Sequence, residues 1–228
     1  MSRFQNSYGI GYRFEDHLVF FGGKNFDEAA FHSEFPGNSV FRIRQTHSSI
    51  ALEASKEIRE ADAHFTTKKS AALVVATADC IPLMIYCHQT HHVAAVHAGW
   101  KGIQNQITCN ILSSLHAAGS TENNFKFYIG PHIQQNSFET DIDVFESMAT
   151  AHPRLDTAAY STFKNGKYYL NLSYLMKYQI EKTIQKPAKI SNLKIDTKTS
   201  DDFYSYRRGK HSRERNLSFI LRLQGILA

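Results

Sequence analysis

The amino-acid sequence predicts a layered α/β (α+β) domain in which helices flank a mixed central sheet. Short apolar runs rich in β-branched and aromatic residues are typical of buried strands, and apolar residues recurring every three or four positions are typical of helices. The two patterns are mixed without strict alternation. No repeat, low-complexity tract or Pro/Ser-rich linker divides the chain, so we expect one domain over residues 1–228.

The predicted strands are spread over the whole chain. Each consists mainly of residues with high β propensity. They cover Leu18–Phe21, Ala71–Ala76, Ile81–Tyr86, Val93–His97, Phe125–Ile129 and Asn216–Leu223. Because these runs are almost continuously apolar, we expect them to form a buried sheet.

Three segments have helical spacing. After Gly102, one apolar stripe predicts a helix that ends near Gly119. A second helix is expected over Ile142–Ala151, before Pro153, and a third over Leu172–Ile184.

Composition excludes several classes of protein. With 42% hydrophobic and 21% charged residues, the chain is typical of a globular protein with a core. No stretch approaches the roughly 20 apolar residues of a membrane helix, and Met1–Gly11 lacks the pattern of a secretion signal. Three cysteines favour a reducing compartment. We expect a cytoplasmic monomer or weak homodimer without a membrane partner, whose net charge of +5 favours small anionic ligands such as phosphate.

Three potential metal ligands follow predicted strands. His47 comes after an apolar run at 40–43, Cys80 lies between two strands, and His97 ends another. Two imidazoles and a thiolate can bind Zn²⁺ and leave its fourth position for water or substrate, as in catalytic sites. The spacing is unlike that of zinc fingers, and each residue alone is also typical of a packed core or loop position. The spacing by itself therefore leaves the site open.

The sequence resembles the YfiH/YlmD family in a series of short motifs. In order, they are Gln45-Thr46-His47, Ala61-Asp62-Ala63 with Thr66, Thr77-Ala78-Asp79-Cys80-Ile81-Pro82, His97-Ala98-Gly99-Trp100-Lys101-Gly102, Ile129-Gly130-Pro131 and Phe203-Tyr204-Ser205-Tyr206-Arg207-Arg208. The resemblance covers nearly the whole chain. Members of this family are labelled laccase-domain or multicopper polyphenol oxidases, and are also described as purine nucleoside phosphorylases.

The resemblance implies a zinc-dependent enzyme that cleaves adenosine, inosine and methylthioadenosine with phosphate, and that deaminates adenosine as a second activity. The metal ligands carry over onto His47, Cys80 and His97, which are then also catalytic. Asp79, next to Cys80, is a candidate for handling protons or supporting a ligand. The cations assigned to phosphate are Lys101, Arg207, Arg208 and Arg215.

The sequence departs from the family pattern at four positions. Asp196 and His132 stand where many relatives have cysteine, Lys101 replaces an arginine, and Glu214 interrupts a Gly-Arg motif. Lysine keeps the charge but loses the planar fork that binds phosphate with two parallel hydrogen bonds. These departures bear on substrate preference more than on the reaction class.

Other functions remain open at this point. A His₂Cys set also occurs in blue-copper sites, where Met84 is the nearest candidate for the weak axial ligand, although paired His-x-His motifs of multicopper oxidases are missing. Cys80 and His97 could instead form a metal-free thiol hydrolase acting on peptidoglycan precursors. A nucleotide-binding module without catalysis is the third reading. Tyr204 and Tyr206 lie near basic residues, but no recognised module surrounds them, so no nucleic-acid partner is expected.

Several conspicuous residues are interpreted as structural. We expect Trp100 to fill the space above a tight turn and Asp62 to cap a turn or loop. We expect His91 and His92 to form an exposed hairpin turn. Cys87 and Cys109 are interpreted as packing residues.

Overall fold

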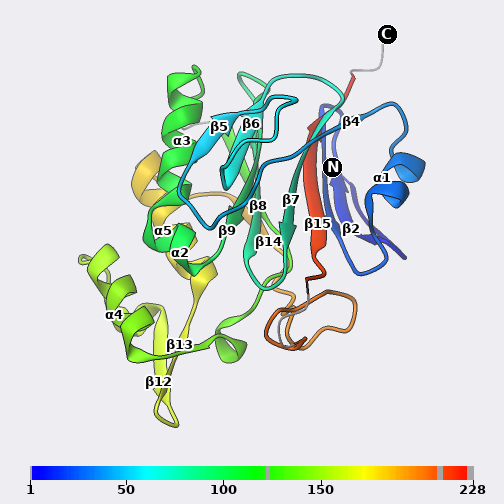
Figure 1. Cartoon of the computed structure of the whole chain (residues 1–228). Helices are drawn as coiled ribbons and strands as arrows, with labels where there is room; N and C mark the ends of the chain where they lie inside the picture. The colour runs from blue at the N-terminus through cyan, green and yellow to red at the C-terminus, as the bar shows by residue number, and fades with distance from the viewer. Residues whose placement is uncertain (1, 122–123, 210–212, 225–228) are drawn as a thin grey trace.

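The computed structural model describes residues 2–121, 124–209 and 213–224. Two six-stranded sheets pack face to face, and helices cover their outer faces (Figure 1). This arrangement confirms the predicted α/β class and the flanking helices. The sequence predicted one central sheet, whereas the structure contains two sheets packed against each other.

The first sheet combines strands from the beginning, middle and end of the chain. Its strands, in spatial order, are β1 (Ser2–Asn6), β2 (Gly9–Arg13), β3 (His17–Gly22), β15 (Asn216–Arg222), β7 (Ala71–Thr77) and β4 (Ser39–Phe41). Strand β15 is antiparallel to both neighbours, β3 and β7. It therefore links the N-terminal strands to the rest of this sheet.

The second sheet comes almost entirely from the middle of the chain. Its order is β14 (Ile190–Asn192), β10 (Phe125–Ile129), β8 (Ile81–Cys87), β9 (Val93–Ala98), β6 (Ala63–Thr66) and β5 (Ala51–Glu53). Strands β8 and β9 form a hairpin in which Ile81 pairs with Ala98. The start of β8 and the end of β9 thus lie side by side, at the same end of these two strands.

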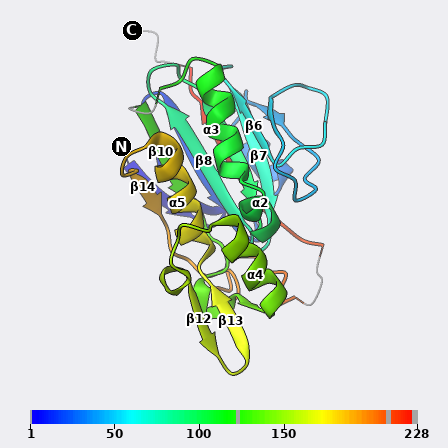
Figure 2. The same cartoon turned by 90° about the vertical axis from the view of Figure 1, so that its left-hand side faces the viewer.

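Five helices and a small sheet complete the described part of the chain. The helices are α1 (Glu28–Glu34), α2 (Trp100–Gln104), α3 (Ile107–Ala117), α4 (Ile142–Ala151) and α5 (Leu172–Ile184), with short 3₁₀ turns at Gln135–Ser137 and Thr157–Ala159. The small sheet has the order β11 (Glu139–Thr140), β13 (Lys167–Leu170) and β12 (Ser161–Lys164). Figure 2 shows α2, α3 and α5 on the outer face of the second sheet, with β12 and β13 extending away from it.

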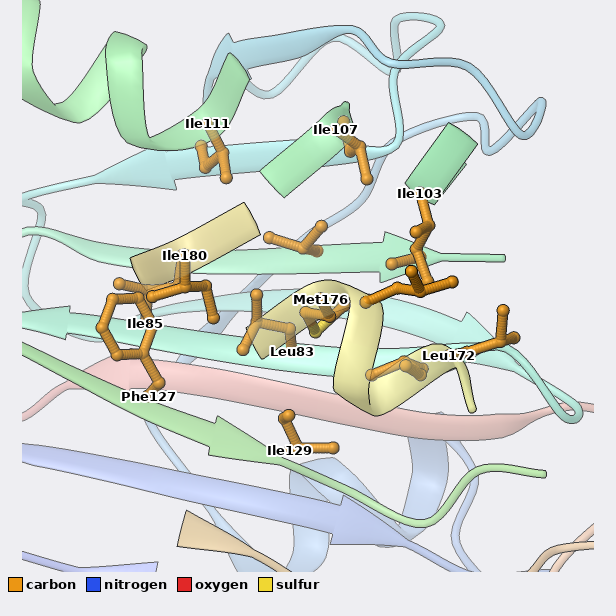
Figure 3. Packing of buried hydrophobic residues seen from close by; sticks show 14 of the residues in the cluster. Leu83, Ile85, Ile103, Ile107, Ile111, Phe127, Ile129, Leu172, Met176 and Ile180 are labelled. Carbon is orange, nitrogen blue, oxygen red and sulfur yellow. The ribbon is translucent and has the colours of Figure 1, made fainter. Parts of the chain in front are cut away.

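Strand β8 explains how the two sheets and the helices share one core. Successive side chains of a strand point to opposite faces. Leu83 and Ile85 therefore join the cluster under the helices, where Ile107 and Ile180 pack (Figure 3). Met84 and its neighbour Tyr86 join the cluster between the sheets. A strand covered on both faces is apolar throughout, which is why this segment was recognisable as a buried strand.

The helix expected after Gly102 is divided in two. Gln106 adopts the left-handed conformation (φ 62°), which interrupts the helical hydrogen bonding between α2 and α3. The other predicted helices, α4 and α5, have the expected bounds. No helix in the described part of the chain is long and apolar enough to cross a membrane.

Candidate active site

The three predicted metal ligands lie together at one end of the central strands of the second sheet. Cys80 directly precedes β8 and His97 lies near the end of β9, so the β8–β9 hairpin brings them to the same place. Nε2 of His47 lies 3.8 Å from Sγ of Cys80, and the two imidazole rings are 4.8 Å apart. One potential ligand atom from each residue falls within 4.8 Å of the others. We call these three residues the His–Cys–His triad.

The chain passes from the first sheet to the second immediately before Cys80. Strand β7 ends at Thr77, and Asp79 adopts a left-handed conformation (φ 79°) that turns the chain into β8. Pro82 lies inside β8 opposite His97, within the strand that the sequence predicted. The turn at 78–80 leaves the thiol of Cys80 half-buried at the junction of the two sheets.

His47 lies in a loop that two buried contacts hold in place. The side-chain amide of Gln45 both donates to and accepts from the backbone of Ala76, at 2.7 Å each. The backbone N–H groups of Thr46, His47 and Ser48 donate to the carboxylate of Asp62. The sequence suggested that His47 follows directly on a strand. In the structure a fixed loop positions it instead.

Asp62 also holds His97. Its Oδ1 accepts a hydrogen bond from Nδ1 of His97 at 2.7 Å, and its carbonyl accepts one from the His97 backbone N–H at 2.8 Å. The expected loop-capping role of Asp62 is confirmed, but the contact with His97 was missed. The sequence did contain a signal for this contact. Asp62 stands between two alanines just before a strand, a position that is expected to be buried, and a buried carboxylate needs hydrogen-bond partners. With Nδ1 occupied, Nε2 of His97 is the nitrogen available for a metal.

Gly99 leaves room for the triad. A Cβ atom at this position would lie 2.9 Å from Sγ of Cys80 and 3.0 Å from Cδ2 of His47. Both distances are shorter than ordinary contacts. Gly99 also precedes α2 as its N-cap residue, with an extended backbone that any residue could adopt. Space beside the triad, and not backbone conformation, thus requires glycine here.

The triad and Asp62 polarise one another. Although burial raises the pKa of Cys80, the charge of His97 and the hydrogen bond from His47 lower it to about 6. Burial lowers the pKa of His97, but the Cys80 thiolate and Asp62 outweigh this effect and raise it to about 9. Burial likewise raises the pKa of Asp62, whereas hydrogen bonds from His97 and Ser48 bring it down to about 2. These interactions favour the charged forms of Cys80, His97 and Asp62 in the absence of a metal.

These residues fit a metal ion. A thiolate and two imidazole nitrogens are zinc ligands, and the hydrogen bond from His97 to Asp62 is the type of support that metal-binding histidines commonly have. Burial decreases from His97 to the exposed His47, so one side of the triad is open. The arrangement is a possible three-ligand metal site with access from solvent.

The triad faces a cavity of about 680 Å³. Three of the four cations predicted to bind phosphate, Lys101, Arg207 and Arg215, line this cavity. Three aromatic residues, Trp100, Phe138 and Tyr206, also line it. Trp100 also packs against the core under the helices, in agreement with its expected structural role. A cavity lined by cations, aromatic rings and the triad can hold a small molecule that carries negative charge.

Arg207 and Arg208 have different surroundings. The guanidinium of Arg207 lies over the ring of Phe138 at 5.4 Å and donates to the carbonyl of Glu139. Arg208 is not among the residues that line the cavity, and it donates to the carbonyls of Lys198, Ser200 and Phe203. Because its hydrogen-bonding groups serve this loop, the structure does not place Arg208 with the other three cations, contrary to the sequence prediction.

Asp79 lines the cavity, but its carboxylate is already engaged. Oδ1 accepts a hydrogen bond from the hydroxyl of Thr197 at 2.6 Å, and Oδ2 accepts one from the backbone N–H of Arg207 at 2.8 Å. It does not belong to the group of ligand atoms around Cys80. Its geometry is that of a residue that holds Arg207 at the cavity wall.

The remaining expectations concern histidines and departures from the family pattern. His132 and Asp196 form an isolated β-bridge with each other, outside the lining of the cavity. His91 lies in the β8–β9 turn as expected but is half-buried, with Nδ1 2.8 Å from the hydroxyl of Tyr86. The neighbouring His92 is buried, and its Nδ1 contacts Thr90 and Ser120. The expectation that His92 is exposed was therefore wrong.

The fold and the site together define an α/β protein with a possible metal site in an open cavity. The chain belongs to the family described as multi-copper polyphenol oxidoreductase laccase, whose model matches residues 15–223. This membership confirms the resemblance found in the sequence motifs.

Curated relatives and a solved structure are also similar to this chain. The chain is 32% identical to a protein of Clostridium acetobutylicum named purine nucleoside phosphorylase, over 82% of this chain and 79% of the relative. It is 29% identical to a protein named adenosine deaminase from an unknown prokaryotic organism, over 57% of this chain and 54% of the relative. The crystal structure of YlmD from Geobacillus stearothermophilus matches 97% of this chain and 99% of its own, with a TM-score of 0.85 at 19% identity. At that identity, the structural match supports the fold alone.

Proposed function

We propose that this protein is a zinc-dependent purine nucleoside phosphorylase that cleaves adenosine, inosine and methylthioadenosine with phosphate, and that it also deaminates adenosine. The observation that carries the proposal is the opening of the His–Cys–His triad into the same cavity as Lys101, Arg207 and Arg215. The names of the relatives, purine nucleoside phosphorylase and adenosine deaminase, supply the two reaction types.

The cations of the cavity would bind phosphate. In phosphorolysis the bond between C1′ of the ribose and the purine nitrogen breaks, and a phosphate oxygen bonds to C1′, which gives ribose 1-phosphate and the free base. Phosphate must therefore be held next to C1′ while positive charge grows on the ribose. Arg207 can offer a planar fork of donors, whereas Lys101 offers a point charge. Asp79 supports this step by anchoring the backbone of Arg207.

The aromatic residues of the cavity would bind the purine. A base stacked on Trp100 or Phe138 would lie beside the triad, since these residues line the same cavity. Zinc held by the triad would act as a Lewis acid toward a polar atom of the substrate. His97 would be kept in orientation by Asp62, and Gly99 would leave the approach to Cys80 and His47 open. The assignment of Asp79 to proton handling stays a prediction.

The direct test is incubation with adenosine, inosine and methylthioadenosine, with and without phosphate, followed by identification of the products. We expect ribose 1-phosphate or its methylthio analogue only with phosphate, and inosine from adenosine without it. Cys80→Ala and His97→Ala should abolish product formation and zinc binding together. Unchanged ribose 1-phosphate formation in either variant would refute the assignment of the triad.

Copper redox chemistry is the first alternative, and the family description favours it. Met84, the candidate axial ligand, is fully buried in the cluster between the sheets and does not line the cavity. The described residues contain one group of three or more potential ligands, the triad itself, whereas a multicopper oxidase needs further copper ligands. Metal analysis of protein purified without added copper, with an absorbance spectrum, distinguishes copper from zinc.

A thiol hydrolase is the second alternative, because the pKa of Cys80 is lowered by the neighbouring histidines. In that case Cys80 would attack an amide or ester, as in editing of peptidoglycan precursors, with His97 as the base. Alkylation of Cys80 without zinc, followed by assays with and without added zinc, separates the two mechanisms. Binding of adenosine without turnover in phosphate buffer would instead indicate a nucleotide-binding module.

A further inference from the structure

Asp62 connects the two segments that carry the histidines of the triad. Its Oδ1 accepts hydrogen bonds from Nδ1 of His97 at 2.7 Å and from the backbone N–H of His47 at 3.1 Å. Its Oδ2 accepts from the backbone N–H of Thr46 at 3.2 Å, and from the N–H and hydroxyl of Ser48 at 2.6 and 2.7 Å. The carboxylate is fully buried. Both of its oxygens are therefore committed to the site.

The backbone of residues 46–48 forms a nest around this carboxylate. Three successive N–H groups converge on one anion, an arrangement that commonly binds phosphates or other anions in proteins. Here the anion comes from the chain itself. His47 adopts a left-handed conformation (φ 59°), which is unfavourable for a residue other than glycine. Hydrogen bonds to a charged, buried acceptor are strong enough to offset that cost.

We infer that Asp62 is a positioning residue that sets both histidines in place before a metal binds. It keeps Nε2 of His97 available by occupying Nδ1, and it holds His47 in its left-handed conformation near Cys80. Neither histidine then has to be ordered when the ion arrives. This inference rests on the proposed metal site and adds to it the residue that preorganises the site.

The first experiment measures zinc affinity of the intact protein by competition with a chelator. Asp62→Asn keeps the size of the side chain but replaces one acceptor oxygen by an NH₂ group. This NH₂ group must face either His97 or the nest, both of which offer donors. We expect zinc affinity to fall by about 10- to 100-fold, the range typical of residues that support metal ligands. Ser48→Ala removes one of the five hydrogen bonds and should have a smaller effect.

Asp16→Asn is the matched control. Asp16 accepts a hydrogen bond from Nδ1 of His17 at 2.6 Å, so the same Asp–His pairing occurs there. This pair lies at the opposite end of β8, where Asp16 also contacts Tyr86, roughly 20 Å from Cys80 along the strand. We expect its zinc affinity to stay within twofold of wild type. Equal losses in both variants would show a general effect of destabilisation and overturn the inference.

A second measurement needs no variant of Asp62. In the nitrogen NMR spectrum of ¹⁵N-histidine-labelled, zinc-loaded wild type, His97 should be protonated at Nδ1 and metal-bound at Nε2. His97→Gln identifies its signals by their loss. An unprotonated or metal-bound Nδ1 would overturn the inference even if Asp62→Asn does not fold. Wild type that binds no zinc would refute the proposed function itself, whereas equal affinity in wild type and folded Asp62→Asn would refute this inference alone.

Discussion

Replacing Gly99 by alanine should weaken metal binding while leaving the fold nearly intact. The new Cβ would lie 2.9 Å from Sγ of Cys80 and 3.0 Å from Cδ2 of His47. Carbon and sulfur atoms need roughly 3.5 Å or more, so these two side chains must move by about 0.5 Å. Zinc–ligand distances are held to within about 0.2 Å. The displacement exceeds what a metal site can absorb.

The expected effect on affinity is at least tenfold, or about 1.4 kcal/mol. The backbone of Gly99 is extended (φ −77°, ψ 174°), so alanine there adds no backbone strain. Chelator competition measures the affinity, and thermal unfolding of the metal-free protein checks the fold. Gly102→Ala, within α2, is the control, because its Cβ would meet Cγ2 of Ile107 at 3.3 Å and, at ordinary distances of 3.5 and 3.8 Å, the backbone oxygens of Ser48 and His97, but none of the three ligand side chains. Wild-type zinc affinity in a folded Gly99→Ala variant would refute the argument.

Three other predictions follow from the side-chain environments. Arg207→Ala should raise the KM for phosphate at least tenfold. Arg208→Ala should lower the melting temperature and leave that KM unchanged, because the hydrogen bonds of Arg208 serve the loop at 198–203. Steady-state kinetics and calorimetry compare the two variants, and the reverse pattern would contradict the assignment. In metal-free protein, Cys80 should react with iodoacetamide at pH 7 faster than the buried Cys87, because the pKa of Cys80 is lowered to about 6. Bound zinc should protect Cys80 from this reaction. Mass spectrometry identifies the labelled cysteine, and preferential labelling of Cys87 would count against a thiolate at Cys80. Burial lowers the pKa of His64 to about 3 and that of His17 to about 4, so between pH 7 and 5 the unfolded chain takes up protons that the folded chain does not. The free energy of unfolding should therefore decrease over this range by about 2 kcal/mol per histidine. Denaturant titrations at pH 7 and 5 measure the decrease, and an unchanged midpoint would exclude it.

The long apolar elements could be predicted from the sequence because local pattern determines them. Strand β8 is buried on both faces and α5 carries one apolar stripe, so each shows a strong signal without reference to the rest of the chain. The break at Gln106 could not be predicted, since a left-handed glutamine has no distinctive sequence signal. The division of strands between two sheets depends on long-range pairings, such as that of β15 with β3 and β7.

The triad was predicted from motifs, but its support was not. Nothing local to Asp62 indicates that one carboxylate reaches both His97 and the loop at 46–48, because these partners are separated by 35 and about 15 positions in the chain. Arg207 and Arg208 are adjacent and chemically identical, and only the tertiary structure shows that one lines the cavity while the other braces a loop. Spacing can nominate residues for a site, but it cannot show which way a side chain points.

The position of β15 has a consequence for the order in which the protein is completed during synthesis. The strand is inserted between β3 and β7, so the gap between them stays open until the ribosome has made residues 216–222. Asn216, the first residue of that strand, exchanges hydrogen bonds with the backbone of Tyr204 at 2.8 Å in each direction. These hydrogen bonds hold Tyr204, three residues before Arg207, once β15 is in place. A nascent chain can therefore assemble the β8–β9 hairpin before residues 216–222 are made, whereas the first sheet closes only after them.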